Sequence, residues 1–187
     1  MMSTVELQIA ERARKHKGEA LHSLYPFIDA TMLEESYNQL NKRSAKGVDG
    51  KTWQQYREEF TERKHSLLEE FRTGRYKAPA IRRVYIPKDK HSLRPLGIPT
   101  IEDKVLQESV RRVLNPIYEE EFKPFSYGFR SGHSAHQAID YLFKEVSFGK
   151  MHYIIDADIK NYFGKINHGM LRDFLDKRIK DGVIRRM

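Results

Sequence analysis

The stretch IRRVYIPKDKHSLRPLGIPT, residues 81–100, contains the clearest chain reversal of this 187-residue sequence. Apolar residues recur over 81–87 and again over 93–99, which predicts two strands, and the polar run 88–92 predicts the loop between them. Pro95 lacks a backbone N–H, so the second strand must have a free edge or a bulge at that point. We therefore expect an antiparallel β-hairpin with a basic tip.

The hairpin region also carries most of the positive charge of the chain. Lysine and arginine number 34 against 26 aspartate and glutamate residues, which gives a net charge of +8. Residues 72–94 hold eight basic residues and one acidic residue, a local charge of +7. This concentration predicts a surface that faces phosphate groups, with a solvated basic face as the alternative. The eight basic residues are Arg72, Arg75, Lys77, Arg82, Arg83, Lys88, Lys90 and Arg94.

Capping residues and apolar periodicity predict helices on both sides of the hairpin. Thr52 and Ser134 begin capping boxes, and Thr100 caps the helix that follows the hairpin. Pro116 is expected to kink or end that helix. The apolar stripe over 53–71 is expected in the core, and helices together with a hairpin indicate the α+β class. Further helices are expected over 4–16, 34–41 and 170–179, and a further strand over 152–159.

Composition excludes several classes of protein. The chain contains no cysteine, which excludes disulfide scaffolds, cysteine-based zinc sites and thiol catalysis. No run of 18 apolar residues is present, so we expect no membrane-spanning helix. The N-terminus has neither a basic flank nor an apolar segment, so secretion is not expected.

The predicted strand over 152–159 carries two carboxylates on one face. Alternation along a strand places Asp156 and Asp158 on one side and apolar side chains on the other. The two carboxylates repel each other unless solvent or a divalent cation neutralises them, and hard oxygen ligands suit Mg²⁺. These residues by themselves leave two alternatives open, a metal site and an exposed strand with two harmless aspartates.

Four blocks of the chain, taken in order, resemble the group II intron-encoded reverse transcriptases, or maturases. The first resembles the extra N-terminal block of those enzymes, the second and third their two fingers blocks, and the fourth the block of the first catalytic aspartate. The resemblance runs from about residue 20 to the end of the chain. The blocks are KGVDG at 46–50, Arg82 with IPK at 86–88 and RPLGIPT at 94–100, SYGFR at 126–130 with SAHQAI at 134–139, and DIKNYF at 158–163 with INH at 166–168.

The resemblance implies a right-hand polymerase that copies RNA into DNA. It implies that residues 1–150 form the fingers with an N-terminal extension, and that residues 151–187 begin the palm. Asp158 would be catalytic and, with the backbone carbonyl of Ile159, would bind Mg²⁺ or Mn²⁺. The implied partners are template RNA, intron RNA, a DNA primer and a dNTP. The implied protein is cytoplasmic, of bacterial type, with a role in intron splicing and retrohoming.

The hairpin cations and one aromatic residue are expected to bind the incoming nucleotide. Arg82 and Arg94 are suited to hold a triphosphate in a forked geometry, and Lys88 would add a point charge. The resemblance implies that Phe163 lies beneath the sugar and excludes ribonucleotides, with plain core packing as the alternative.

The other predicted contacts are with nucleic acid. The 46–50 loop would form a lid on the template strand, with an ordinary loop as the alternative. Arg130 is expected to contact nucleic acid or the nucleotide, with a structural ion pair as the alternative. His133 and His136 are not expected to bind a metal, because no cysteine or suitably spaced carboxylate accompanies them. The expected nucleic-acid contacts are Lys46, Gly47, Asp49, Gly50, Arg83 and Arg130.

One block of the family is missing from these residues. No Asp-Asp pair occurs in the chain, so the family's Tyr-x-Asp-Asp block is absent. Two-metal phosphoryl transfer needs further carboxylates, and we therefore expect no polymerisation by this chain alone. Because helical spacing continues to Met187 without a terminator, we expect part of a longer protein. The alternatives are a non-catalytic RNA-binding module and a reverse transcriptase of a CRISPR or defence system.

Overall fold

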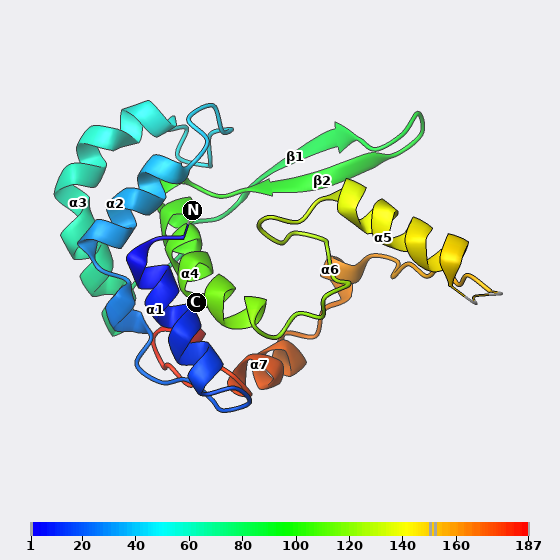
Figure 1. Cartoon of the computed structure of the whole chain (residues 1–187). Coiled ribbons are helices and arrows are strands. Elements are labelled where there is room, and N and C mark those ends of the chain that lie inside the picture. Colours follow the sequence, from blue (N-terminus) through cyan, green and yellow to red (C-terminus); the bar gives the residue numbers. More distant parts are fainter. Residues whose placement is uncertain (1, 150, 152, 187) are drawn as a thin grey trace.

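The structure is a computed structural model that describes residues 2–149, 151 and 153–186 (Figure 1). A helical body carries two projections on one side, a β-hairpin and an isolated helix. The elements in chain order are α1 (Thr4–Lys15), η1 (Tyr25–Phe27), α2 (Ala30–Gln39), α3 (Trp53–Thr73), β1 (Arg82–Pro87), β2 (Leu93–Ile98), α4 (Ile101–Glu119), α5 (Ala135–Phe148), α6 (Tyr162–Lys165), α7 (His168–Asp176) and η2 (Ile184–Arg186).

Helix α4 is the central element of the body and packs against α1, α2 and α3. It begins where predicted, because the Thr100 hydroxyl accepts a hydrogen bond from the Asp103 N–H at 3.3 Å. The helix continues past Pro116 to Glu119, so Pro116 does not end it. Its inward face supplies much of the core, with Val105, Leu106, Val113 and Ile117 fully buried.

An aromatic cluster joins α2 to α3. The rings of Tyr37 and Trp53 stack at a centroid distance of 4.6 Å. The Tyr37 hydroxyl donates to the Trp53 carbonyl at 2.6 Å, and Trp53 Nε1 donates to the Tyr37 carbonyl at 2.9 Å. Phe60 stacks on Tyr37 at 4.8 Å. Buried aromatic pairs contribute about 0.5–1.5 kcal/mol beyond the area they bury, and the 53–71 stripe is core as its spacing predicts.

The hairpin forms as predicted. The described residues contain one sheet, which consists of β1 and β2. The two strands are antiparallel, and Arg82 lies opposite Ile98. The loop is closed by a hydrogen bond from the Lys88 N–H to the Ser92 carbonyl at 2.9 Å. Each strand of this two-stranded sheet has a free edge, which is the setting that Pro95 requires. Helices with this hairpin confirm the α+β class.

The residues after α7 return to the N-terminal part of the body. Arg178 donates hydrogen bonds to three carbonyl groups in and just after α1. Buried Asp181 accepts from the N–H groups of Leu24 and Tyr25 at 2.7 and 2.9 Å. Ile179 lies in the same core cluster as α1 and α4. These residues therefore share the core of the body.

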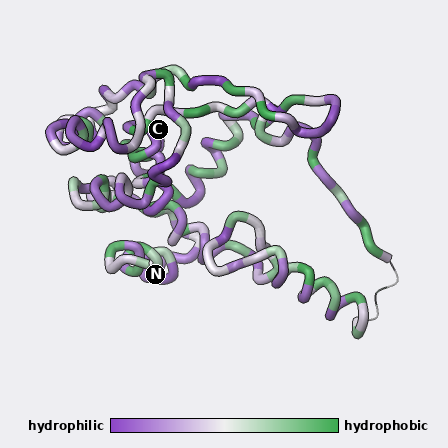
Figure 2. The backbone as a smooth tube through the Cα atoms, turned by 90° about the horizontal axis from the view of Figure 1, so that it is seen from above, coloured by the Kyte–Doolittle hydropathy of each residue, from purple (hydrophilic) through white to green (hydrophobic). Residues whose placement is uncertain are grey.

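The strand expected over 152–159 is not formed. His152 lies outside the described residues, and residues 153–159 run as an exposed, irregular segment (Figure 2). Ile155 is 91% exposed. A strand needs a neighbour to satisfy its backbone N–H and C=O groups, and no described segment pairs with this one. The prediction from alternation is therefore wrong for this structure.

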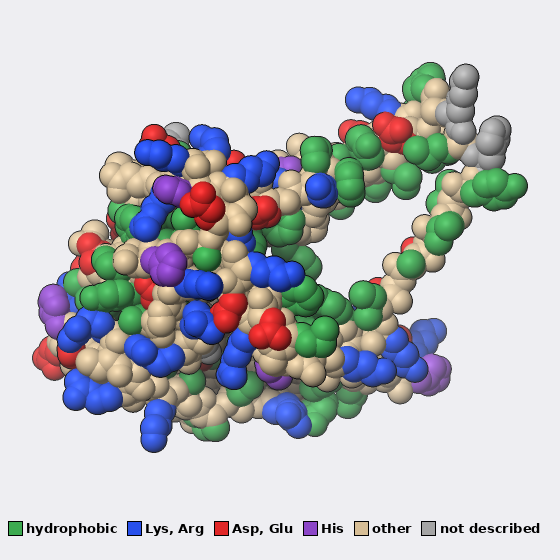
Figure 3. Space-filling model, turned by 90° about the horizontal axis from the view of Figure 1, so that it is seen from below, with side chains coloured by type: hydrophobic (Ala, Val, Ile, Leu, Met, Phe, Trp, Pro, Cys, Tyr) green, Lys and Arg blue, Asp and Glu red, His purple; other side chains and the backbone are tan. Residues whose placement is uncertain are grey.

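Helices α5 and α7 have the predicted apolar faces but leave them exposed. No residue of either helix is buried, and Phe143 of α5 and Phe174 of α7 are 64% and 57% exposed. The helical spacing of Met170 and Leu171 would predict that both side chains point inward, but this is wrong, because both are exposed. Figure 3 shows hydrophobic side chains along the projecting arm and the thin segment that faces it. No helix of the described residues is long and apolar enough to cross a membrane.

Candidate nucleic-acid interface

The register of the hairpin sorts its arginines onto two faces. Side chains alternate along each strand, and directly opposed residues share a face. Arg82 and Arg94 lie on one face, which we call the front face, and Arg83 lies on the other, the back face. The front face consists of Arg82, Val84, Ile86, Arg94, Leu96 and Ile98, and the back face of Arg83, Tyr85, Pro87, Leu93, Pro95 and Gly97.

These three arginines have no acidic partner among the described residues. None of the ion pairs or side-chain hydrogen bonds found there involves Arg82, Arg83 or Arg94. Asp89, the one acidic residue of the region, accepts hydrogen bonds from Ser92 and from the His91 backbone, which lower its pKa. Unpaired guanidinium groups with five donors each are available for phosphate oxygens.

The 46–50 loop packs against the base of the hairpin. A Cβ on Gly47 would lie 2.6 Å from the Thr100 Cα, so only glycine allows this approach. Gly50 has a φ of +69°, a conformation that favours glycine, and it ends the loop before the cap of α3. The side chains of Lys46 and Asp49 are exposed. The structure thus places this block beside β2 and the start of α4.

Lys104 binds the residues just before this loop and is absent from the predicted site. Its Nζ donates to the Ala45 carbonyl at 2.8 Å and lies 3.4 Å from the Ser44 hydroxyl. Burial lowers the pKa of Lys104; the negative charge of Asp49 opposes this shift, and the positive charge of Arg82 adds to it. The sequence does contain a signal, since a lysine in the first turn of a helix opposes the helix dipole. Lys104 brings the loop and Arg82 into one positively charged region.

Arg130 is held inside the protein. Its side chain is 8% exposed and donates to Glu119 Oε1 at 2.6 Å. It also donates to the carbonyls of Lys123 and Ser126 at 3.0 and 2.5 Å, and its guanidinium lies 5.0 Å from the Phe122 ring centroid. Of the two roles that the sequence leaves open, the structure shows the ion pair. A nucleic-acid contact by Arg130 stays a prediction.

Asp158 lies in the exposed segment that precedes α6. Asp156 and Asp158 are both exposed, and without a strand they have no common face. Asn161, with a φ of +54°, turns the chain into α6. The Phe163 ring is 80% exposed and meets Tyr162 edge-on at a centroid distance of 5.3 Å. The core-packing alternative for Phe163 is therefore not observed, and its role at the sugar stays a prediction.

The oxygen donors at Asp158 suit a hard divalent cation but are few. The described residues contain no group of three or more His, Cys, Asp and Glu side chains that could hold a metal ion. The Asp158 carboxylate and the Ile159 carbonyl are donors that Mg²⁺ accepts, and Mg²⁺ is octahedral. The chemistry of these donors fits the ion, and they would supply part of its coordination shell.

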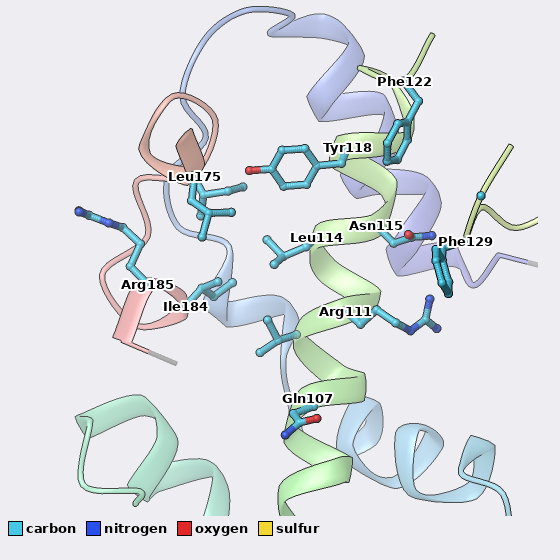
Figure 4. A pocket seen from close by; sticks show the side chains of 13 residues that line it. Gln107, Arg111, Leu114, Asn115, Tyr118, Phe122, Phe129, Leu175, Ile184 and Arg185 are labelled. Atoms are coloured by element: carbon cyan, nitrogen blue, oxygen red, sulfur yellow. The ribbon is translucent and has the colours of Figure 1, made fainter. Parts of the chain in front are cut away.

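A pocket of about 560 Å³ lies between α4 and the residues after α7 (Figure 4). Leu114 and Tyr118 enter it from α4, Leu175 from α7, and Phe129 from the loop before α5. None of the residues predicted from the sequence to bind nucleotide, metal or nucleic acid lines this pocket. It is therefore a feature separate from the hairpin and the 46–50 loop.

Comparison with known proteins identifies the family to which this chain is similar. The family described as "Reverse transcriptase (RNA-dependent DNA polymerase)" matches residues 86–181. The chain is 33% identical over 184 residues to "Group II intron-encoded protein LtrA" of Lactococcus lactis subsp. cremoris. The aligned region covers 94% of this chain and 30% of that protein. It is 33% identical over 138 residues to "Protein YkfC" of Escherichia coli (strain K12), and the aligned region covers 72% of this chain and 36% of that protein.

A yeast intron protein is similar as well. The chain is 31% identical over 163 residues to "Putative COX1/OXI3 intron 1 protein" of Saccharomyces cerevisiae, covering 86% of this chain and 19% of that protein. The chain thus spans between 19% and 36% of the length of these three relatives.

Proposed function

The chain belongs to the reverse transcriptase family, and on that premise we propose that it provides the fingers and the beginning of the palm of a group II intron-type RNA-directed DNA polymerase. Residues 1–150 form the fingers with an N-terminal extension in this proposal, and residues 151–187 begin the palm. The observation that carries it is a pair of arginines on the front face of the hairpin, Arg82 and Arg94, that have no ion pair among the described residues.

The incoming dNTP would bind the front face. Arg94 lies opposite Ile86, four residues along β1 from Arg82, so the two Cα positions are about 14 Å apart along the strand. Their long side chains can converge on a triphosphate from both ends, each guanidinium offering two parallel hydrogen bonds to phosphate oxygens. Lys88, at the tip, would add a third positive charge.

The template strand would run past the 46–50 loop. Gly47 and Lys104 fix this loop to the base of the hairpin, next to Arg82. The exposed Lys46 is then available for a template phosphate. Arg83 would contact nucleic acid from the back face, whereas Arg130 would do so only by leaving its ion pair with Glu119.

Asp158 and the Ile159 carbonyl would hold Mg²⁺ or Mn²⁺. Such a cation, when bound, neutralises negative charge on the transferring phosphate. The exposed ring of Phe163 would lie beneath the sugar, where a 2′-hydroxyl has no room and no hydrogen-bond partner. Because the chain contains no Asp-Asp pair, we expect it not to polymerise by itself.

The complete protein would use template RNA, a DNA primer and dNTPs, and would bind intron RNA in splicing and retrohoming. A second candidate is a non-catalytic RNA-binding module. One observation favours that candidate: the described residues bring no third carboxylate or other metal-binding side chain to Asp158 and Asp156.

Primer extension on an RNA template, by a complete protein containing this chain, tests the proposal. Asp158→Asn should abolish extension. Arg82→Gln together with Arg94→Gln should raise the KM for dNTP at least about tenfold, because a hydrogen bond to a charged group contributes about 1.5–3 kcal/mol. Arg57→Gln, an exposed arginine of α3 without an ion pair among the described residues, is the matched control and should leave KM unchanged. Extension that survives Asp158→Asn would refute the assignment.

A further inference from the structure

The back face of the hairpin contains a hollow with an aromatic residue beside it. Gly97 has no side chain, and Ile81, Arg83 and Pro95 surround the space above it, a volume of about 390 Å³. Tyr85, opposite Pro95 on the same face, is 56% exposed. A Cβ at position 97 would lie 3.3 Å from the end of the Ile81 side chain, so a larger residue there would occupy part of this space.

These groups have the chemistry of a site for an unpaired nucleotide. Every base has a π face, so an exposed ring on a sheet surface offers stacking that is independent of sequence. Sheet surfaces that bind single-stranded RNA use aromatic rings and arginine planes in this way. Arg83 lies two residues before Tyr85 on the same strand, about 7 Å away, and can meet the phosphate of a nucleotide whose base lies on Tyr85.

Charge favours nucleic acid over a protein as the occupant. Residues 72–94 carry a charge of +7, and Arg83 has no ion pair among the described residues. No acidic residue belongs to the back face. A polyanion compensates this charge, whereas an apolar protein surface would leave the Arg83 guanidinium without a partner.

We propose that the back face of the hairpin is a second nucleic-acid site, at which the base of an unpaired RNA nucleotide stacks on Tyr85 and its phosphate binds Arg83. The hollow over Gly97 gives the edge of the base room to enter. Because the front face points the opposite way, the hairpin can hold RNA on one side and a nucleotide on the other. The inference rests on the proposed function, which takes the front face as the nucleotide site and Arg83 as a nucleic-acid contact, and it adds the stacking site on Tyr85 and the hollow over Gly97.

Fluorescence anisotropy of a labelled short oligouridylate with the 187-residue chain tests this site. Tyr85→Leu removes the ring and keeps an apolar side chain, and it should raise the Kd about 5- to 150-fold, the range for loss of one stacked base. Gly97→Val fills the hollow without changing charge, at a position whose φ any residue can adopt, and should weaken binding in the same direction. Phe148→Leu, which changes an exposed aromatic residue of α5 in the same way, is the control and should change the Kd less than twofold.

Three results would overturn the proposal. The first is a Kd for Tyr85→Leu and Gly97→Val equal to that of the unchanged chain. The second is an equal loss in Phe148→Leu, because binding would then not depend on the position of the aromatic ring. The third is association of two copies that Tyr85→Leu abolishes without a change in RNA affinity, which would make the back face a protein contact.

In the complete protein, separate measurements test the front-face site and the back-face site. The KM for dNTP should rise with Arg82→Gln and Arg94→Gln and stay unchanged with Tyr85→Leu. A back-face failure therefore leaves the front-face assignment standing, and the reverse also holds.

Discussion

Three arginines differ in role between two regions: Arg112 forms ion pairs inside the helical body, whereas Arg82 and Arg94 are exposed on the hairpin. In the body, Arg112 is 1% exposed and donates to Glu6 of α1 at 3.1 Å and to Glu35 of α2 at 2.7 Å. In the hairpin, Arg82 and Arg94 are exposed and have no ion pair among the described residues. In the body the guanidinium group of Arg112 holds three helices together, whereas those of Arg82 and Arg94 in the hairpin are available to a ligand.

This difference separates stability from binding. Removing one partner of a buried ion pair is strongly destabilising, because the other charge loses its compensation. Removing an exposed, unpaired charge usually changes the free energy of unfolding by less than about 0.5 kcal/mol. The same type of substitution should therefore unfold one region and leave the other folded but unable to bind a polyanion.

The largest expected effect belongs to Arg112→Ala. It removes the link between α1, α2 and α4 and should lower the free energy of unfolding by about 2–3 kcal/mol, less than for a fully buried pair because Glu35 is half-exposed. Urea unfolding measures the change. Arg83→Ala, the matched hairpin variant, should stay within about 0.5 kcal/mol of the unchanged chain. An equal loss of unfolding free energy in the two variants would contradict the proposed difference between the body and the hairpin.

Asp181 should give the next largest effect, and its sign depends on pH. Burial tends to raise the pKa of Asp181, but hydrogen bonds from four backbone N–H groups outweigh it, so the pKa in the folded protein is lowered. The stabilisation is then fully present above the unfolded pKa of about 3.9 and is lost as pH falls toward the folded value. Asp181→Asn should lower the free energy of unfolding by about 1–3 kcal/mol at neutral pH.

Unfolding measured from neutral pH down through the acid range tests this sign. The gap between the unchanged chain and Asp181→Asn should narrow as pH drops below about 4. A gap that widens with acidification would show that burial, and not hydrogen bonding, controls this carboxylate.

Phe163→Val should have a small effect on stability. The ring is 80% exposed, so its removal should change the free energy of unfolding of this chain by less than about 0.5 kcal/mol. In the complete protein the same change should raise ribonucleotide incorporation while deoxynucleotide use continues, which primer extension with each nucleotide type measures. A loss of about 1–4 kcal/mol without a change in sugar selectivity would identify Phe163 as core.

Local patterns predicted the elements whose stabilising contacts are local. The hairpin, the capping box at Thr52 and the cap at Thr100 depend on residues a few positions apart, and all of them form as expected. The segment 153–159 has the alternation of a strand but needs a partner from elsewhere, which alternation does not reveal.

In the candidate site, too, the sequence predicts local motifs but not the contacts between distant residues. The sequence identifies the hairpin cations and the 46–50 loop as separate motifs, and the strand register then assigns each arginine to a face. Lys104 binds Ala45, the residue before the loop, across 59 residues, and Arg112 binds Glu6 across 106. Arg130 is fixed by Glu119 through a contact that the motif alone does not show. Such pairings depend on the packing of α4 and require the three-dimensional structure.

The salt dependence of RNA binding tests the central claim most directly, namely that the hairpin cations are available to a polyanion. Each phosphate contact to single-stranded nucleic acid contributes a slope of about −0.7 to log affinity against log salt. Replacing Arg82, Lys88 and Arg94 by Ala should flatten that slope by about 2 and leave stability unchanged. Replacing three ion-paired cations of the body, Arg14, Lys64 and Arg111, removes the same charge and should leave the slope as it was. An unchanged slope in the hairpin variant, or equal flattening in both, would contradict the account.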